Sequence, residues 1–185
     1  MEKIIILDRD GVINLDSDNY IKSVEEWVPE QDSIKAITEL TDHGFKIFVA
    51  TNQSGISRKF YSHNTLNAMH NKLRQLCAEA GGKISGIVYC PHGPDDNCSC
   101  RKPKPGLFEK IEAQITTPMS EIFTVGDSFR DLEAGLTAGA KPILVLTGKG
   151  ERTLEEKSEA LKDNAIPIKK NLLEAARHVI AASKC

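Results

Sequence analysis

The chain has 185 residues, of which 40% are hydrophobic and 27% charged, and its net charge is -2 at pH 7. This length suits one domain with a buried core, and we expect a single domain over residues 1–185. The slightly acidic balance argues against a general nucleic-acid binder, and no apolar run approaches the length that spans a membrane.

The first residues lead directly into an apolar run. Because only residues 1–3 precede this run, a cleavable signal peptide has no room, and we expect a cytoplasmic protein. Residues 4–7 (Ile-Ile-Ile-Leu) are typical of a strand that is buried on both faces. Asp8 and Asp10 follow at once, at the sheet edge where open parallel sheets bind ligands. Two close carboxylates repel each other unless a cation lies between them, which favours Mg²⁺, although a solvated turn has the same composition.

Helices and strands alternate along the rest of the chain. Residues 11–30 lack periodicity and are expected to form an ordered loop over the strand end, followed by a helix from Asp32 to Gly44 and a strand over 46–50. That strand ends in Thr51-Asn52-Gln53-Ser54-Gly55, whose hydroxyl and amide groups suit an anion, unless the segment is a simple turn. Later elements are expected as helix 62–81, strand 84–89, a helix from Pro105 to Pro118, strand 122–125, a helix ending at Gly139, strand 142–146, helix 153–162, a strand near Ile166 and helix 172–182. This alternation predicts an α/β fold in which helices cover both faces of a parallel sheet.

Three of the five cysteines are close together in the sequence, at Cys90, Cys98 and Cys100. With His92 they supply three thiolates and an imidazole, the ligand set of a closed tetrahedral zinc site. Four protein ligands leave no position for water, so we expect a structural zinc. A loop of free thiols is the alternative, but its Pro, Gly and Asp residues offer no core that would hold its shape. Cys77 falls in a helical apolar stripe and is expected to be a buried small hydrophobe.

The segment after the cysteines, Arg101-Lys102-Pro103-Lys104-Pro105, alternates three cations with prolines and cannot form a regular helix. It suits a phosphate, because Arg can bind two phosphate oxygens and Lys adds a point charge, whereas a solvated basic turn is the alternative. Asp127 ends a later strand and is the expected third oxygen ligand of a cation near Asp8. For Asp131, orienting a metal-bound water and capping the next helix both stay open.

These motifs, in this order, resemble the four motifs of the haloacid dehalogenase-like phosphatases. The matching segments are Asp8-Arg9-Asp10-Gly11-Val12, Thr51-Asn52, Lys102 before Pro103, and Gly126-Asp127-Ser128-Phe129-Arg130-Asp131. Together with Cys-Pro-His and Cys-x-Cys-Arg-Lys-Pro, they are similar to the heptose bisphosphate and histidinol-phosphate phosphatases. The resemblance implies a Rossmann-like sheet with no large cap domain, the zinc loop partly taking the place of the cap. It also implies Mg²⁺-dependent hydrolysis of the 7-phosphate of a heptose 1,7-bisphosphate on the way to ADP- or GDP-heptose for lipopolysaccharide core.

The resemblance further implies a role for each motif residue. Asp8 is expected to attack phosphorus and form an aspartyl-phosphate, while Asp10 protonates the leaving oxygen and then deprotonates the attacking water. Mg²⁺ is expected to be held by Asp8, Asp127 and the main-chain carbonyl of Asp10. The phosphoryl oxygens are expected to contact Thr51, Asn52 and Lys102. The rest of the substrate is expected to contact Asp16, Asn19, Tyr20, Gln53, Ser54 and Arg101.

Two positions depart from the family pattern. Val12 stands where Thr is commoner, and Ser128 stands where the heptose enzymes often carry Lys. The second departure removes one expected cation near the substrate, for which Lys104 or Arg58 could compensate. These departures concern substrate identity more than reaction class.

Several alternatives to a heptose phosphatase remain. A histidinol-phosphate phosphatase shares the same motifs, and a polynucleotide 3′-phosphatase is disfavoured by the acidic balance. A zinc-stabilised phosphate-binding module without catalysis is a third possibility, but binding alone gains nothing from two carboxylates that face an anion. We expect a monomer that acts on a small-molecule sugar phosphate, without a nucleic-acid or membrane partner.

Overall fold

The strand that carries the two aspartates lies in the middle of the sheet. In the computed structural model, which describes residues 2–183, six parallel strands follow the order β3-β2-β1-β4-β5-β6. The strands are β1 (Lys3–Leu7), β2 (Phe45–Asn52), β3 (Ile84–Cys90), β4 (Phe123–Gly126), β5 (Lys141–Val145) and β6 (Ile168–Lys169). Met1 and Cys185 lie outside the described residues. The predicted α/β class with a parallel sheet is therefore confirmed.

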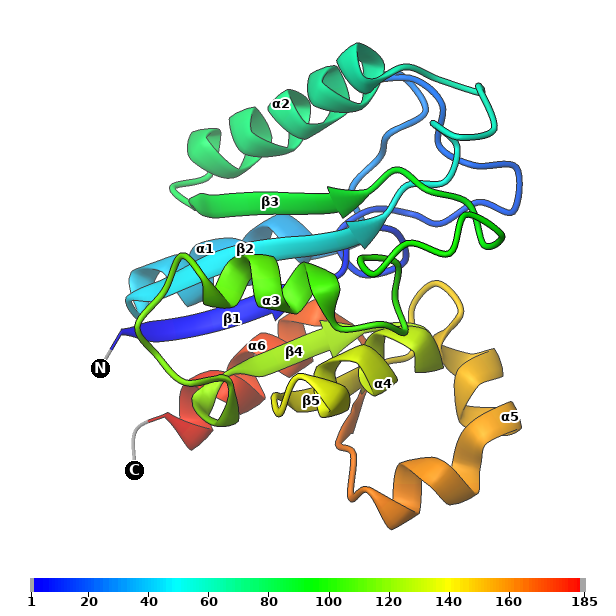
Figure 1. Ribbon diagram of the computed structural model, residues 1–185. Helices are drawn as coiled ribbons and strands as arrows, with labels where there is room; N and C mark the ends of the chain where they lie inside the picture. Colours follow the sequence, from blue (N-terminus) through cyan, green and yellow to red (C-terminus); the bar gives the residue numbers. More distant parts are fainter. Residues whose placement is uncertain (1, 184–185) are drawn as a thin grey trace.

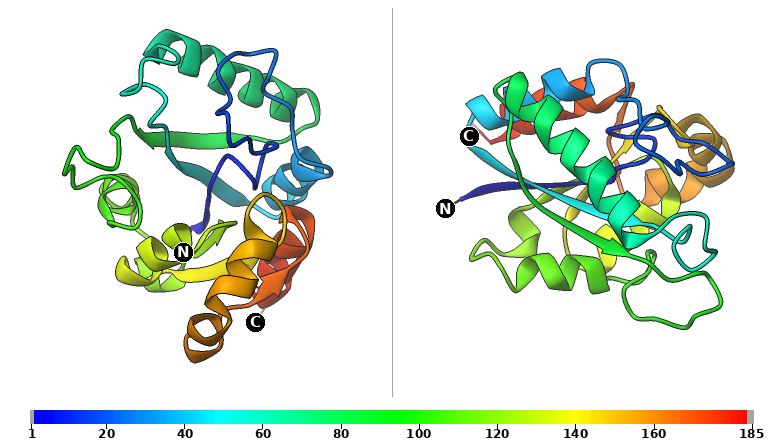
Figure 2. Two further views of the ribbon diagram at one scale, coloured as in Figure 1. Left: turned by 90° about the vertical axis from the view of Figure 1, so that its right-hand side faces the viewer. Right: turned by 90° about the horizontal axis from the view of Figure 1, so that it is seen from above.

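Helices cover both faces of this sheet (Figure 1). Three lie over one face: α1 (Ser33–Asp42), α2 (His63–Glu79) and α6 (Leu172–Ala182). Two lie over the other, α3 (Gly106–Glu112) and α4 (Phe129–Thr137), and the two layers are separated in both views of Figure 2. The remaining elements are the 3₁₀ helix η1 (Met119–Glu121) and α5 (Gly150–Asp163). None of the helices in residues 2–183 has both the length and the apolar character to cross a membrane.

The apolar run of β1 is explained by its position between two cores. Ile5 and Leu7 face the cluster formed with α1, α2 and α6, whereas Ile4 and Ile6 face the cluster formed with α3 and α4. All four side chains are buried. Because each buried aliphatic side chain contributes about 2 kcal/mol through the hydrophobic effect, a strand covered on both faces needs no polar alternation.

The structure differs from the predicted elements at several places. β2 continues through Asn52, because Thr51 and Asn52 pair with Tyr89 and Cys90 of β3, and this pairing keeps polar residues in the strand. The last strand lies at Ile168–Lys169, beyond the expected position, since Ile166 packs against helices in the third hydrophobic cluster. α5 begins at Gly150, within the segment expected to be a loop, and η1 was not predicted.

The carboxyl ends of the strands point to one side of the molecule, where the loops gather (Figure 1). β1 lies between β2 and β4. The strands after β1 therefore extend the sheet first toward one edge, as far as β3, and then toward the other edge, from β4 to β6. A crevice forms at such a point in open parallel sheets, because the loops after adjacent strands diverge. The loops that follow β1, β2 and β4 therefore bring their polar residues to one edge.

Candidate active site

Three carboxylates meet at this edge. Asp8 follows β1, Asp127 follows β4, and Asp131 lies in the first turn of α4. One carboxylate oxygen from each lies within 4.8 Å of the others. The predicted proximity of Asp8 and Asp127 is therefore present, since β1 and β4 are hydrogen-bonded neighbours. Asp131 joins them and also caps α4, because its Oδ2 accepts hydrogen bonds from the backbone N–H (3.0 Å) and hydroxyl (2.6 Å) of Ser128.

Two glycines allow the chain to close around Asp127. A Cβ atom on Gly11 would lie 2.1 Å from Oδ2 of Asp127, and one on Gly148 would lie 2.3 Å from the same atom. Both glycines also have positive φ angles, of 80° and 56°, which side chains rarely tolerate. The same oxygen accepts a hydrogen bond from the backbone N–H of Lys149 at 2.8 Å. The loops after β1 and β5 thus form a close cradle for one carboxylate.

Lys102 is the buried cation of this cluster. Its Nζ lies 2.9 Å from Oδ1 of Asp8 and 2.6 Å from Oδ1 of Asp131, and it donates to the carbonyl of Ala50 at 2.8 Å. The side chain of Asn52 fixes the lysine backbone, because its amide donates to the Lys102 carbonyl and its oxygen accepts from the Lys102 N–H, both at 3.1 Å. The side chain of Asn52 therefore positions Lys102, and its polar atoms are used within the protein.

One cation does not balance three carboxylates. Burial, followed by the charge of Asp131, raises the pKa of Asp8 to about 7. Burial and the charges of Asp131 and Asp8 also raise the pKa of Asp127 well above its ordinary value. Burial opposes ionisation of Asp131 too, but Lys102 outweighs it and lowers the pKa of that group. Crowded carboxylate oxygens that lack positive charge are a donor set that fits Mg²⁺.

Mg²⁺ affinity is therefore expected to depend on pH. Because the pKa of Asp8 is raised to about 7 without a cation and that of Asp127 is raised as well, the ion must displace protons from both carboxyls at low pH. Its dissociation constant should therefore rise at least about tenfold per pH unit well below about pH 7. Calorimetric titration with Mg²⁺ from about pH 5 to about pH 8 measures this dependence. A dissociation constant that stays constant over this range would contradict the crowded site.

The carboxylate of Asp10 lies outside this cluster and is held by its own donors. Oδ1 accepts hydrogen bonds from Nη2 of Arg9 at 2.7 Å and from Nδ2 of Asn14 at 2.9 Å, while Oδ2 accepts one from Gln53 at 2.8 Å. Burial opposes ionisation, but Arg9 and these hydrogen bonds outweigh it and lower the pKa of Asp10. Arg9 is 1% exposed, and no role was predicted for it. The sequence did contain a signal for this role of Arg9: a charged residue directly after a buried strand is expected to be buried and to need a partner of opposite charge.

A cavity of about 350 Å³ opens beside Asp10 and the cluster of Asp8, Asp127 and Asp131. Its walls include most of the predicted substrate contacts: Asp16, Tyr20, Asn52, Gln53, Ser54 and Arg101. Asn19 does not line the cavity and is exposed, because the turn at residues 17–20 directs Tyr20 inward, with a φ angle of 65°. Thr51 and Lys102 also line it, although both are buried.

Three further cations reach the cavity: Arg58, Arg130 and Lys149. Of the two residues suggested to replace a lysine at position 128, Arg58 lines the cavity, whereas Lys104 does not, because its ammonium group donates to the carbonyl of Cys98 at 2.8 Å. Sequence reasoning missed Arg130 and Lys149. They lie near the starts of α4 and α5, and only the strand order brings these helix starts to the loops of β1 and β2.

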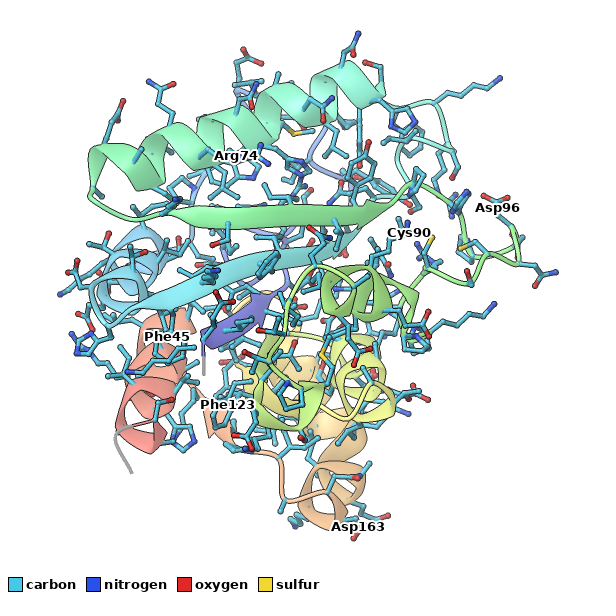
Figure 3. The ribbon with its side chains drawn as sticks, turned by 60° about the vertical axis from the view of Figure 1, so that its left-hand side comes forward. Phe45, Arg74, Cys90, Asp96, Phe123 and Asp163 are labelled. Carbon is cyan, nitrogen blue, oxygen red and sulfur yellow. The ribbon has the colours of Figure 1, made fainter. Side chains whose placement is uncertain are left out.

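The cysteine loop brings its four predicted ligands together. The three Sγ atoms and Nδ1 of His92 form one cluster, with 3.6 Å between the sulfurs of Cys90 and Cys98 and 3.4 Å from Nδ1 to Cys100. In a tetrahedral zinc site with bonds of about 2.3 Å, neighbouring sulfurs lie about 3.8 Å apart, so these separations fit zinc. Figure 3 shows Cys90 at the end of β3 and Asp96 farther out on this loop. The cluster therefore joins the end of β3 to the segment that carries Lys102.

A family model, known sequences and a solved structure that are similar to this chain all point to phosphatases or related hydrolases. Residues 99–175 match a family described as HAD-hydrolase-like. The D-glycero-beta-D-manno-heptose-1,7-bisphosphate 7-phosphatase of Pseudomonas putida is 58% identical over 154 residues, which cover 83% of this chain and 88% of that protein. The enzyme of the same name from Neisseria meningitidis is 51% identical over 162 residues, or 88% of this chain and 87% of that one. The crystal structure of D,D-heptose 1,7-bisphosphate phosphatase from B. bronchiseptica, complexed with magnesium and phosphate, has a TM-score of 0.92 and 41% identity, covering 97% of this chain and 99% of its own.

Proposed function

Because the chain belongs to the heptose 1,7-bisphosphate 7-phosphatase family of HAD-like hydrolases, we propose that it removes the 7-phosphate of D-glycero-beta-D-manno-heptose 1,7-bisphosphate. It is a phosphoric monoester hydrolase. The observation that carries the proposal is the cluster of Asp8, Asp127 and Asp131 around Lys102 beside an open cavity. Its product would enter the synthesis of ADP- or GDP-heptose for lipopolysaccharide core.

In the proposed mechanism, a carboxylate oxygen of Asp8 attacks phosphorus while the bond from phosphorus to the sugar oxygen breaks. For this step Asp10 must enter the reaction protonated, against the lowered pKa that Arg9 and its hydrogen bonds give it. It gives that proton to the sugar oxygen, then takes a proton from the water that attacks phosphorus and releases Asp8. Lys102 and the hydroxyl of Thr51 hold the phosphoryl oxygens. When bound by the carboxylates of Asp8 and Asp127, Mg²⁺ would neutralise charge between nucleophile and phosphate.

A sugar bisphosphate brings a second phosphate. We assign it to three cations of the cavity, Arg101, Arg130 and Lys149, which lie outside the cluster of Asp8, Asp127 and Asp131. Burial, followed by the charge of Arg130, lowers the pKa of Arg101. Burial and Arg130 also oppose the protonation of Lys149, but Asp16, whose carboxylate lies 3.0 Å from its ammonium group, outweighs them and raises the pKa of Lys149. Arg130 therefore stands close enough to Arg101 and to Lys149 to repel both. Such a group of cations is stabilised by an anion that lies between them.

Replacing Arg130 with Gln is therefore expected to affect the second phosphate alone. The KM for the heptose bisphosphate should rise about tenfold, with kcat within about twofold, because one charge-assisted contact in the ground state and transition state is lost. Hydrolysis of a heptose 7-monophosphate should not change. Lys104→Gln is the matched control, since that ammonium group lies outside the cavity. Equal losses on both substrates would contradict the assignment.

The function itself is tested by phosphate release with Mg²⁺ from a panel of substrates. The panel contains both anomers of heptose 1,7-bisphosphate, histidinol phosphate and a 3′-phosphorylated oligonucleotide. We expect the beta anomer of the bisphosphate to give the highest kcat/KM, as the names of the relatives indicate. A preference for histidinol phosphate would favour the alternative function, and no turnover on any member would favour a binding module.

We also propose a structural role for zinc, a cytoplasmic location and a monomeric state. The cluster of Cys90, His92, Cys98 and Cys100 supplies four ligands and leaves no position for a water, so the zinc would not take part in the reaction. Reduced thiols are maintained in the cytoplasm, which supports that location. We propose a single domain that acts as a monomer, since the loops at one edge of its sheet supply the lining of the cavity.

A further inference from the structure

A chain of hydrogen bonds in the cavity wall links Asp10 and Thr51 through Gln53, to which the mechanism above gives no role. Its centre is Gln53, which is 3% exposed. Its Nε2 atom donates to Oδ2 of Asp10 at 2.8 Å and to Oγ1 of Thr51 at 2.9 Å. Its Oε1 atom accepts from the hydroxyl of Tyr61 at 2.6 Å. Both amide hydrogens and the amide oxygen are therefore used within the protein, and Gln53 has no free donor for a substrate.

The partners of Gln53 fix the orientation of its amide. If the amide were reversed, Oε1 would face the carboxylate of Asp10, and two acceptors would repel each other. In the observed orientation, Thr51 receives a hydrogen bond at its oxygen, so its own hydroxyl proton must point elsewhere. Thr51 lines the cavity, and the proton is therefore free to be donated to an oxygen within the cavity.

Tyr61 reaches Gln53 only because residue 55 is a glycine. A Cβ atom on Gly55 would lie 2.2 Å from Cε1 of the Tyr61 ring, which is closer than real atoms approach. The ring itself is buried, at 8% exposure. Within the Thr51–Gly55 motif, Gln53 thus makes the hydrogen bond with Tyr61, and Gly55 leaves room for the Tyr61 ring.

We propose that Gln53 is a positioning residue that orients the carboxylate of Asp10 and the hydroxyl of Thr51 together, and that Tyr61 acts through Gln53. The proposal rests on the phosphatase mechanism above, in which one of these groups moves the proton of the leaving oxygen and the other holds a phosphoryl oxygen. It replaces the expectation that Gln53 contacts the substrate. A single amide thereby couples two groups that must act on the same phosphate.

Kinetics of two variants and their combination test this role. Gln53→Met keeps the length of the side chain and removes all three hydrogen bonds, whereas Tyr61→Phe removes one. With heptose bisphosphate and Mg²⁺, kcat is expected to fall about 30-fold and about fivefold respectively, with KM within about twofold. If Tyr61 acts only through Gln53, the double variant should be no slower than Gln53→Met, although the Tyr61 side chain also lines the cavity. Tyr89→Phe is the matched control, since that hydroxyl pairs with His63 on the surface.

Two kinetic outcomes would overturn the proposal. Multiplying losses in the double variant would mean that Tyr61 acts independently of Gln53. A raised KM with unchanged kcat in Gln53→Met would mean that Gln53 binds substrate directly.

A second measurement does not need turnover. In a ¹⁵N-labelled sample, the side-chain amide signals of Gln53 are assigned by their loss in Gln53→Met. We expect Tyr61→Phe to shift these signals and Tyr89→Phe to leave them in place. Unshifted signals in Tyr61→Phe would refute the contact itself. If the wild-type protein released no phosphate, the proposed function would fail, while the amide signals would still decide the positioning role.

Discussion

Asp8→Asn is expected to lower kcat by on the order of 10⁴-fold or more, because the amide cannot form the aspartyl-phosphate. The near-identical shape should leave the fold intact, and Lys102 keeps its ion pair with Asp131 at 2.6 Å. Phosphate release from the heptose bisphosphate with Mg²⁺ measures the effect. Asp42→Asn at the exposed end of α1 is the control and should retain full activity. Substantial turnover by Asp8→Asn would show that another group is the nucleophile.

The same variant should be at least as stable as the wild-type protein when no Mg²⁺ is present. In the folded state the pKa of Asp8 is raised to about 7, mainly by burial and then by Asp131. A raised carboxyl pKa means that the folded state binds the proton more tightly, so the stability this proton contributes is lost as pH rises through that pKa. At a pH above about 8, the neutral amide avoids this loss. The loss begins near the unfolded pKa of 3.8 and levels off above about pH 7. Thermal unfolding of both proteins with a chelator should therefore show little difference at about pH 4 and a gain for Asp8→Asn that grows up to about pH 7 and stays constant above it.

Loss of the metal in the cysteine loop is the second large effect. Cys100→Ser removes one ligand, and we expect it to abolish zinc binding and lower the free energy of unfolding by about 3 kcal/mol or more. For a chain of this size, that loss corresponds to a fall in Tm of about 6–12 °C. Because Lys102 follows the cluster by two residues, kcat should also fall about tenfold through misplacement of its ammonium group. Zinc content, thermal unfolding and phosphate release are measured on one preparation.

Cys77→Ala serves as the control for this experiment. It removes a thiol that is buried in the core beneath α2 and lies outside the metal cluster. This variant should keep one zinc per chain and its activity, with at most a modest fall in Tm. If Cys100→Ser also retained one zinc per chain, or unfolded at the wild-type temperature, the structural role of the metal would be wrong.

The sequence allowed prediction of features that depend on local patterns. The apolar run of residues 4–7 identified a strand buried on both faces, and the structure confirms it. The cysteine spacing predicted a four-ligand cluster, and the four side chains do converge. Asp8 and Asp127 were expected to share an edge because each follows an apolar strand. Such patterns are readable because the backbone repeat and the residue chemistry act over a few positions.

Features that depend on tertiary contacts could not be predicted in the same way. Of the two roles left open for Asp131, one oxygen serves the helix cap, while the other pairs with Lys102, a contact that was not predicted. Arg130 reaches the cavity only through the strand order, and Asn19 points away from it because of one turn. Gln53 has the chemistry of a substrate contact, but its partners come from the loop after β1, from β2 and from a later loop. Except at Asn19, where a local turn decides, these side chains are explained at least in part by residues distant in sequence.

The placement of the opening strand in the middle of the sheet has a consequence for folding. Asp8 belongs to the start of the chain, whereas Asp127 and Asp131 belong to its second half, and each contributes an oxygen to the carboxylate cluster. No partially folded state that lacks either half could assemble the carboxylate cluster. Enzyme activity should therefore disappear along the same denaturant curve as the whole sheet, so catalysis reports cooperative unfolding rather than local fraying.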